Sequence, residues 1–194
     1  ILDYGLYAFA MSRYASVWVG LKCLKDTIES TSSGDGSLDR VKIVIPDDYE
    51  MPPGGLSIRV RDGILEQEAR LQEHKRDAML AFIRANKLNK IITSGGPNAK
   101  VGIITTGKSY LDVRQAMDDL GIDEVRANDL GVRLYKIGCP WPLEPEGLKE
   151  FARGLEMIIV VEEKRSLIEV QVREELFGTP NQPVVVGKKD EKGS

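Results

Sequence analysis

The chain has few of the side chains that build metal centres. Its 194 residues include two cysteines and one histidine. Cys23 and Cys139 lie far apart with no Cys-x-x-Cys pair, whereas iron–sulfur and zinc sites need clusters of such ligands. Two cysteines could form one disulfide, but we expect reduced thiols in a cytoplasmic protein. His74 stands alone in a charged segment, as surface histidines do. The sequence therefore predicts no metal site.

The chain also has no large excess of charge of one sign and no long apolar run. The formal net charge is −3 and no long basic run occurs, so the chain lacks the electrostatic footprint of a nucleic-acid-binding protein. No apolar stretch approaches the roughly 20 residues that a bilayer-spanning helix needs. A signal peptide is not recognisable either. We therefore predict neither a nucleic-acid partner nor a membrane partner.

Apolar runs that alternate with helical patterns predict an α/β fold. Four short runs rich in β-branched residues read as strands, at 100–106, 132–138, 157–161 and 183–186. Helical patterns separate them, which indicates crossover connections and a parallel sheet. We predict a three-layer α/β/α domain with a mostly parallel sheet. Its tail, residues 187–194, is charged and expected to fray.

The first half of the chain is less regular. The chain begins at Ile1 without a methionine, so we expect a segment taken from a longer protein. Residues 64–87 read as a long charged helix, and residues 89–99 as a junction. An earlier helix is predicted at 7–15, with short strands at 17–19, 41–45 and 57–61.

Several helix starts carry local signals. Pro145 suits the first turn of a helix. Ser166 and Glu169 have the spacing of a capping box, in which the two residues satisfy each other's free backbone amides. Ser109 and Asp112 resemble a second such box.

One segment matches a nucleotide-binding pattern. Residues 102–109 fit G-x-x-x-x-G-K-[ST], and residues 158–162 resemble an apolar strand that ends in an acidic magnesium ligand. Such a protein hydrolyses nucleotides and surrounds the phosphates with loop amides. However, Ile103 and Ile104 are β-branched and apolar, which favours a buried strand that leads into a helix. The nucleotide-binding alternative would use Gly102, Gly107, Lys108 and Ser109.

The sequence Gly34-Asp-Gly36 resembles the start of the magnesium–diphosphate motif of thiamine enzymes. That motif also needs an asparagine on the far side of a following helix. Residues 58–66 contain no asparagine, and prolines interrupt the stretch before them. We therefore interpret residues 34–36 as a polar turn.

A charged cluster follows the predicted strand at 157–161. It would lie at the carboxyl end of a parallel strand, the edge where open α/β sheets bind ligands. The cluster either contacts a neighbouring domain or starts a solvated helix, with a glutamate near the positive end of its dipole. Residues 139–142 form a rigid apolar elbow whose tryptophan packs within the chain or at an interface. The candidate interdomain contacts are therefore Trp141, Glu162, Glu163, Lys164 and Arg165.

Segments along nearly the whole chain resemble one family, the indolepyruvate:ferredoxin oxidoreductases, in their large fused bacterial form. Trp18-Val-Gly-Leu-Lys22 and Val160-Val-Glu-Glu-Lys-Arg165 are two of these segments. The order and spacing of the segments carry the resemblance, since no single motif decides it. The others are residues 2–5, 10–14, 26–30, 75–86, 107–113, 120–123 and 140–144.

The resemblance implies a thiamine-diphosphate-dependent enzyme. Such an enzyme oxidatively decarboxylates a 2-oxoacid, for example an arylpyruvate, to an acyl-coenzyme A. Electrons pass through iron–sulfur clusters to ferredoxin, and the thiamine cofactor with its magnesium ion carries the carbanion chemistry. The implied partners of the parent enzyme are ferredoxin, coenzyme A and its remaining domains or subunits, in a homo-oligomer.

In such an enzyme the chain would hold three parts. Residues 1–33 would end a pyrimidine-binding-type domain, residues 34–97 would connect, and residues 98–194 would form a transketolase C-terminal-like domain. The complete thiamine motif and the cysteine clusters are absent from the sequence. We therefore assign no catalytic, cofactor-binding or metal residue, and we expect a noncatalytic assembly piece that is inactive alone and binds no thiamine diphosphate.

Overall fold

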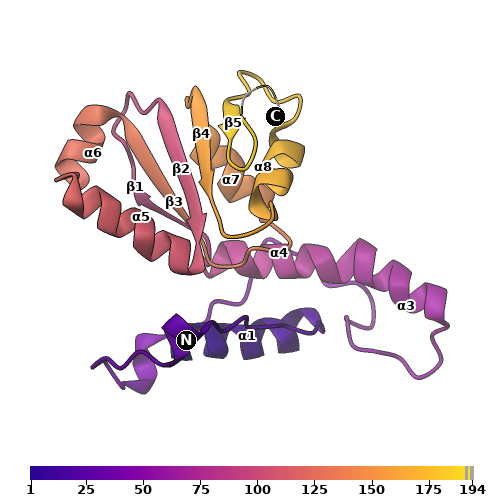
Figure 1. Cartoon of the computed structure of the whole chain (residues 1–194). Coiled ribbons are helices and arrows are strands. Elements are labelled where there is room, and N and C mark those ends of the chain that lie inside the picture. Colours follow the sequence, from indigo (N-terminus) through magenta and orange to yellow (C-terminus); the bar gives the residue numbers. More distant parts are fainter. Residues whose placement is uncertain (191, 193–194) are drawn as a thin grey trace. The chain divides into compact units, whose positions relative to one another are not determined.

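The computed structural model of the chain describes residues 1–190 and 192, so positions 191, 193 and 194 of the predicted tail lie outside the described residues. The chain divides into two compact units, Ile1–Asn86 and Lys87–Ser194 (Figure 1). None of the helices in the described part of the chain combines the length and apolar composition needed to cross a bilayer.

The first unit is helical. The predicted long helix is confirmed, because α3, the π-helical turn η2 and α4 follow one another without a break. Its helices are α1 (Leu2–Ala15), α2 (Lys25–Ile28), η1 (Leu38–Arg40), α3 (Ile64–Arg70), η2 (Leu71–Lys75) and α4 (Arg76–Ala85).

The three strands predicted in this unit are not formed. Residues 17–19, 41–45 and 57–61 have no strand structure. A strand needs a neighbour for its backbone groups, and here a side chain satisfies part of that need. The amide of Val44 donates to Asn86 Oδ1 at 2.8 Å, and Asn86 Nδ2 donates to the carbonyl of Val44 at 2.8 Å.

The second unit is an α/β domain with a five-stranded sheet in the order β1-β3-β2-β4-β5. β1 (Lys90–Thr93) runs antiparallel to β3. The other strands are mutually parallel: β2 (Val101–Thr106), β3 (Val132–Ile137), β4 (Met157–Val161) and β5 (Val184–Val186). The helices are α5 (Gly107–Asp119), α6 (Glu124–Leu130), α7 (Pro145–Ala152) and α8 (Ile168–Leu176).

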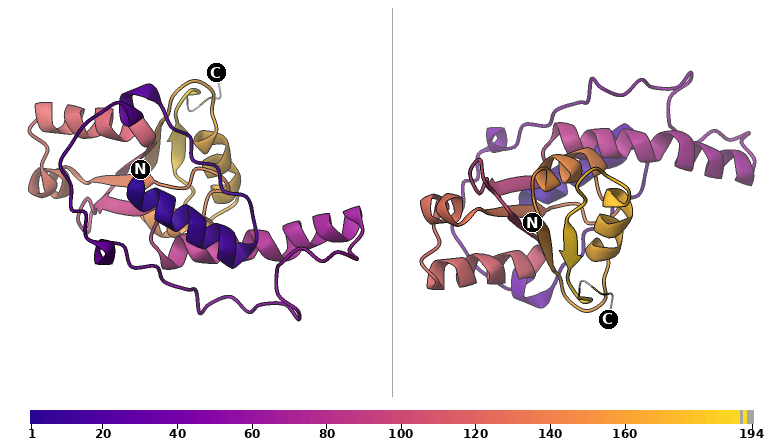
Figure 2. Two further views of the ribbon diagram at one scale, coloured as in Figure 1. Left: turned by 90° about the horizontal axis from the view of Figure 1, so that it is seen from below. Right: turned by 90° about the horizontal axis from the view of Figure 1, so that it is seen from above.

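Helices cover both faces of this sheet, so the predicted three-layer α/β/α fold with a mostly parallel sheet is confirmed. α5 and α6 lie on one face, and α7 and α8 lie on the other (Figures 1 and 2). One apolar cluster packs under α5 and α6 and includes Met117, Ala127 and Leu134. The larger cluster, under α7 and α8, includes Phe151, which stacks on Tyr135 with ring centroids 4.8 Å apart.

Strand β2 shows why its residues are apolar on both faces. Ile104 is fully buried in the larger cluster, while Ile103 packs against the α5–α6 cluster. Gly102 lies on the same face as Ile104, and a Cβ added there would stand 2.5 Å from Leu155 Cδ1 and 2.6 Å from Phe151 Cζ. The close approach of α7 and the residues after it to β2 therefore requires a glycine.

Strand β1 and helix α6 were not anticipated, and the predicted junction at 89–99 contains β1. β1 is an edge strand of four residues, and its pairing with β3 is irregular between Ile91 and Thr93. Such a short run lacks the length from which a periodic pattern can be recognised. By contrast, Pro145 stands at the start of α7 as predicted, where Glu144 accepts hydrogen bonds from the amides of Glu146 and Gly147.

Candidate functional site

The sheet topology brings two candidate segments to one edge. From β2 the chain moves to β3 on one side, then returns past β2 to β4 on the other side. Thr105 pairs with Val161, so β2 and β4 end together. Residues 107–109 and 162–165 therefore meet at the switch point of the sheet, the place where open α/β sheets bind ligands.

The loop that the nucleotide-binding alternative requires is not formed. Residues 101–105 pair with β3 on one side and β4 on the other, which engages their backbone in the sheet. Helix α5 starts at Gly107, directly after β2. Lys108 Nζ lies 2.8 Å from Asp112 Oδ1, one turn further along the helix. Gly102 therefore fills a packing position, and the amides from Gly102 to Thr106 do not surround an anion.

The predicted capping boxes are wrong. Ser109 lies inside the first turn of α5, whose N-cap residue makes no side-chain hydrogen bond. At α8, Ser166 Oγ bonds the Glu169 carboxylate at 3.0 Å and caps no backbone amide. A more distant residue, Glu162, performs that function.

Glu162 caps helix α8 from the end of β4. It is buried, at 8 % exposure. Its carboxylate accepts hydrogen bonds from the amides of Leu167, Ile168 and Glu169 at 2.9, 3.0 and 3.0 Å. These contacts satisfy free amides at the positive end of the helix. Glu162 therefore caps helix α8. This agrees with the interpretation that the charged cluster starts a helix with a glutamate near the positive end of its dipole.

The remaining candidate contacts stay at the surface. Glu163, Lys164 and Arg165 are exposed in the turn between β4 and α8. Trp141 is 69 % exposed. These side chains are available to a neighbouring domain, whereas Glu162 is not.

Two amide side chains hold the elbow that carries Trp141. Asn89 Oδ1 accepts hydrogen bonds from the amides of Gly138 and Cys139 at 2.9 and 3.1 Å. Gln171 of α8 accepts from the amide of Leu143 at 2.8 Å and donates to the carbonyl of Pro140 at 2.9 Å. Neither residue could be recognised in the sequence, because their partners are backbone groups far away along the chain. These hydrogen bonds therefore fix the backbone on both sides of the exposed indole.

Cys139 belongs to this elbow and is a poor nucleophile. Burial raises the pKa of its thiol, and a hydrogen bond to the carbonyl of Trp141 only partly opposes that effect. A raised pKa keeps the sulfur protonated at neutral pH. The cysteine therefore contributes packing to the elbow.

A second carboxylate, Glu169, joins α8 to the strand beyond it. It is 2 % exposed, and it accepts hydrogen bonds from the amide of Lys188 at 2.7 Å and from Arg173 Nη2 at 2.9 Å. Arg173 also donates to the carbonyl of Val185 at 2.6 Å. The predicted fraying of the tail is therefore wrong at Lys188, which the network anchors.

The residues present do not fit a metal or a thiamine cofactor. Among the described residues, no group of three or more His, Cys, Asp or Glu side chains could hold a metal ion. Cys23 and Cys139 are both unpaired and belong to different units. Asp35 Oδ1 accepts a hydrogen bond from the amide of Ser37 at 2.8 Å, which agrees with the predicted polar turn. Iron–sulfur and magnesium–diphosphate chemistry therefore has no ligand set in the described part of the chain.

Comparison with known proteins assigns the α/β unit. The family model of the indolepyruvate oxidoreductase domain matches residues 91–194. The chain belongs to the indolepyruvate oxidoreductase domain family. This membership confirms the resemblance recognised in the sequence, and the matched residues fall within the second unit of the structure.

Relatives of this domain are subunits of longer proteins. Indolepyruvate oxidoreductase subunit IorA of Pyrococcus horikoshii is 40% identical over 79 residues, which are 41% of this chain and 11% of that protein. The corresponding subunit of Methanothermobacter thermautotrophicus is 28% identical over 92 residues, which are 46% of this chain and 13% of that protein. The chain therefore spans little more than a tenth of the length of the curated relatives it matches.

Two solved structures are similar to this chain. One is a 2-oxoglutarate:ferredoxin oxidoreductase from Magnetococcus marinus with 2-oxoglutarate, coenzyme A and succinyl-CoA bound. It is 20% identical with a TM-score of 0.48, and the match covers 78% of this chain and 24% of that one. The other, a split-gene transketolase in an inactive tetramer, is 20% identical with a TM-score of 0.37 and covers 51% of this chain and 31% of that one.

Proposed function

We propose that this chain is a noncatalytic structural part of an indolepyruvate:ferredoxin oxidoreductase. The intact enzyme would oxidatively decarboxylate an arylpyruvate to an acyl-coenzyme A and pass the electrons to ferredoxin. Membership of the indolepyruvate oxidoreductase domain family is the observation that carries this proposal. The curated relatives support it, since they are named as subunits of that enzyme.

We propose that the chain holds three parts of that enzyme. Residues 1–33 would end a pyrimidine-binding-type domain, residues 34–97 would connect, and residues 98–194 would form the transketolase C-terminal-like domain. The last residues of the connecting part add strand β1 to the sheet of that domain. Thiamine diphosphate, magnesium and the iron–sulfur clusters would be held by other parts of the enzyme, because the donor set described above fits none of them.

The carboxyl edge of the sheet supports an assembly function. Two of its charged side chains are engaged within the domain, Glu162 with the amides of α8 and Lys108 with Asp112. Trp141 remains exposed on its braced elbow, with Lys164 and Arg165 exposed at the same edge. Tryptophan and arginine dominate the binding energy of many protein interfaces. We propose that this edge contacts the remaining domains or subunits of the enzyme.

Replacing Trp141 with alanine should weaken that contact in the intact enzyme. Loss of an interface tryptophan costs about 2 kcal/mol or more, so the dissociation constant of the assembly should rise by roughly 30-fold. Sedimentation measures the assembled fraction, and arylpyruvate-dependent, coenzyme-A-dependent reduction of a viologen dye measures activity. We expect activity to fall in step with assembly, while the KM for arylpyruvate in the assembled fraction stays unchanged.

Phe177→Ala is the matched control for that experiment. Phe177 is also exposed, at 83 %, but it follows the other end of α8, away from the carboxyl edge. Its replacement should leave assembly and activity unchanged. An intact assembly in Trp141→Ala would refute the proposed contact, and an intact enzyme without arylpyruvate-dependent dye reduction would refute the proposed activity.

The noncatalytic assignment has a test of its own. Titration calorimetry of the chain with thiamine diphosphate and magnesium should give only heats of dilution, because the described residues offer no diphosphate ligands. Magnesium alone serves as the control titration. Tight uptake of the cofactor that depends on magnesium would contradict a purely structural part.

A further inference from the structure

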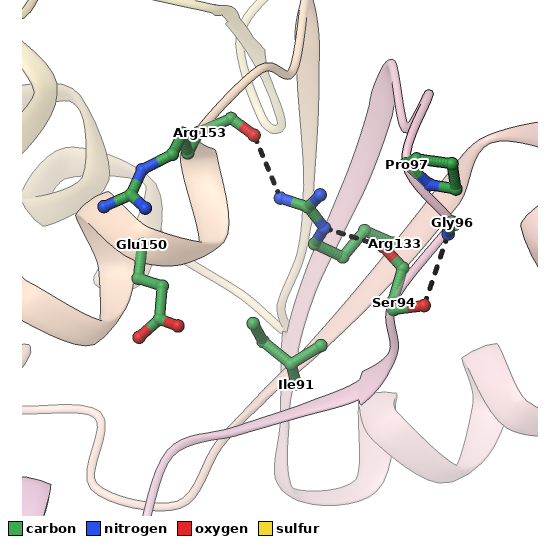
Figure 3. A pocket seen from close by; sticks show the side chains of 7 residues that line it. All are labelled: Ile91, Ser94, Gly96, Pro97, Arg133, Glu150 and Arg153. Atoms are coloured by element: carbon green, nitrogen blue, oxygen red, sulfur yellow. Dashed lines mark hydrogen bonds between the residues drawn. The ribbon is translucent and has the colours of Figure 1, made fainter.

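A pocket of about 480 Å³ opens at the amino edge of the parallel strands, opposite the carboxyl edge that carries Trp141 (Figure 3). One wall is the end of α7, and the other is the turn that follows β1. Its lining residues are Ile91, Ser94, Gly96, Pro97, Arg133, Glu150 and Arg153.

Arg133 reaches across the pocket and caps the carboxyl end of α7. Its Nε donates to the carbonyl of Ser94 at 2.8 Å, and its Nη1 donates to the carbonyls of Phe151 and Arg153 at 2.5 and 3.1 Å. A cation at the carboxyl end of a helix interacts favourably with the helix dipole. Its Nη2 makes no hydrogen bond within the described part of the chain, so one edge of the guanidinium is left for a ligand.

Two further charged side chains, Glu150 and Arg153, line the pocket. Glu150 and Arg153 are exposed, and neither side chain forms a hydrogen bond or an ion pair with another described residue. The Glu150 carboxylate acts on Arg133, because it raises the pKa that burial of the guanidinium lowers. The pocket is thus lined by two arginines and one glutamate beside the apolar surfaces of Ile91 and Pro97, and the exposed side chain of Arg153 extends away from Arg133 (Figure 3).

We propose that this pocket binds a free α-amino acid with an apolar side chain. The ligand carboxylate would pair with the outer edge of Arg133 and with Arg153, whose exposed side chain would rotate toward the pocket. Its ammonium group would pair with Glu150. Its side chain would cover Ile91 and Pro97. The volume lies within the usual range of small-molecule pockets, about 300–1,000 Å³. The site is independent of the proposed assembly function, which uses the opposite edge of the sheet.

The charges favour a ligand that carries both signs. A simple carboxylic acid would meet the guanidinium groups but would leave Glu150 unpaired and close to its own negative charge. A simple amine would leave both arginines unpaired. An α-amino acid pairs all three side chains at once. Because these charges face water and are screened, we expect a dissociation constant on the order of 1 mM.

Nuclear magnetic resonance on the isotope-labelled chain tests this assignment with three probes. They are L-leucine, 4-methylpentanoate, which lacks the amino group, and 3-methylbutylamine, which lacks the carboxylate. We expect leucine to shift the amide signals of Ser94, Gly96 and Arg133 saturably. It should bind roughly tenfold more tightly than either analogue, the equivalent of about one ion pair in this setting.

Two variants assign the charges. Glu150→Gln should lower the affinity for leucine to that for 4-methylpentanoate. Arg153→Gln should lower the affinity for both compounds. Glu174→Gln on α8 and Arg126→Gln on α6 are matched charge controls at exposed positions outside the pocket and should bind like the original chain. Arg133 is left unchanged because its removal would also uncap α7.

Three results would overturn the proposal. One is the absence of saturable shifts at the pocket amides up to the solubility limit of leucine. Another is equal binding of leucine and 4-methylpentanoate by the original chain. The third is a Glu150→Gln variant that still prefers leucine over the deaminated acid.

Discussion

Replacement of Gly102 by valine should destabilise the α/β unit by about 3 kcal/mol, the upper part of the range for overpacked cores. The first added carbon alone would stand 2.5 Å from Leu155 Cδ1 and 2.6 Å from Phe151 Cζ. Strand β2 cannot move aside easily, because it pairs with β3 and β4 on both edges. Urea-induced unfolding followed by near-ultraviolet circular dichroism measures the loss as a lower midpoint at an unchanged slope.

A compensating substitution separates this clash from other causes. Leu155→Ala removes the nearer of the two obstructing side chains, so the double variant should be more stable than the sum of the single losses predicts. Such coupling between touching residues is typically about 0.5–3 kcal/mol. If Gly102 were instead a glycine of a phosphate-binding loop, valine there would leave the unfolding midpoint near that of the original chain. That result would reinstate the nucleotide-binding alternative.

The parallel strands could be predicted because each one carries its own signal. Ile103 and Ile104 face opposite layers of the fold, and both positions are apolar. A strand covered on both faces reads as a continuous apolar run, which requires no knowledge of its neighbours. The same reasoning located β4 and β5, which are continuous apolar runs. β3 carries Arg133 and Lys136, and it was predicted from its apolar residues and from the helical patterns on either side.

The elements that were missed, or predicted wrongly, depend on partners far away in the sequence. Residues 41–45 have the composition of a strand, but Asn86 bonds the backbone of Val44 and no strand pairs with it. Conversely, β1 is short and forms because β3 offers it an edge. The local composition shows that a segment can form a strand, whereas pairing with a neighbouring strand decides whether it does so.

At the candidate site, too, local features could be predicted from the sequence, whereas features that depend on distant partners could not. The sequence placed residues 162–165 at the carboxyl edge of the sheet correctly, since this follows from the strand order. It assigned the cap of α8 to Ser166, the residue type expected at that spacing. The structure uses Glu162, because the chain turns back after β4 and brings this carboxylate under the first amides of the helix. The pocket around Arg133 had no sequence signal, because its walls come from segments that only the sheet brings together.

Replacement of Glu169 by glutamine should destabilise the α/β unit by about 2–3 kcal/mol at neutral pH. The buried carboxylate accepts hydrogen bonds from the amide of Lys188, from Arg173 and from Ser166. A glutamine offers one oxygen and turns an NH₂ group toward some of these donors. Urea-induced unfolding at pH 7 measures the loss, and Glu174→Gln, an exposed position on the same helix, is the control.

The pH dependence of that loss identifies its cause. Burial raises the pKa of Glu169, but hydrogen bonds from Lys188, Arg173 and Ser166 outweigh burial, so its pKa lies below the ordinary value of 4.5. The folded state therefore binds fewer protons here than the unfolded state. The stabilisation should be complete above the ordinary pKa and should disappear as the pH falls through the lower value of the folded state.

The free-energy difference between the original chain and Glu169→Gln should accordingly be constant from about pH 8 to pH 6 and shrink below pH 4.5, where the original chain protonates and comes to resemble the variant. Lys188 makes this test sensitive to the tail, since its amide lies 2.7 Å from the carboxylate. The protection of the Lys188 amide against hydrogen exchange, relative to the intrinsic exchange rate at each pH, should fall over the same acidic range. A difference in stability that persisted unchanged at pH 3 would mean that glutamine disturbs the packing of α8, and that the charge of Glu169 does not hold the strand and helix together.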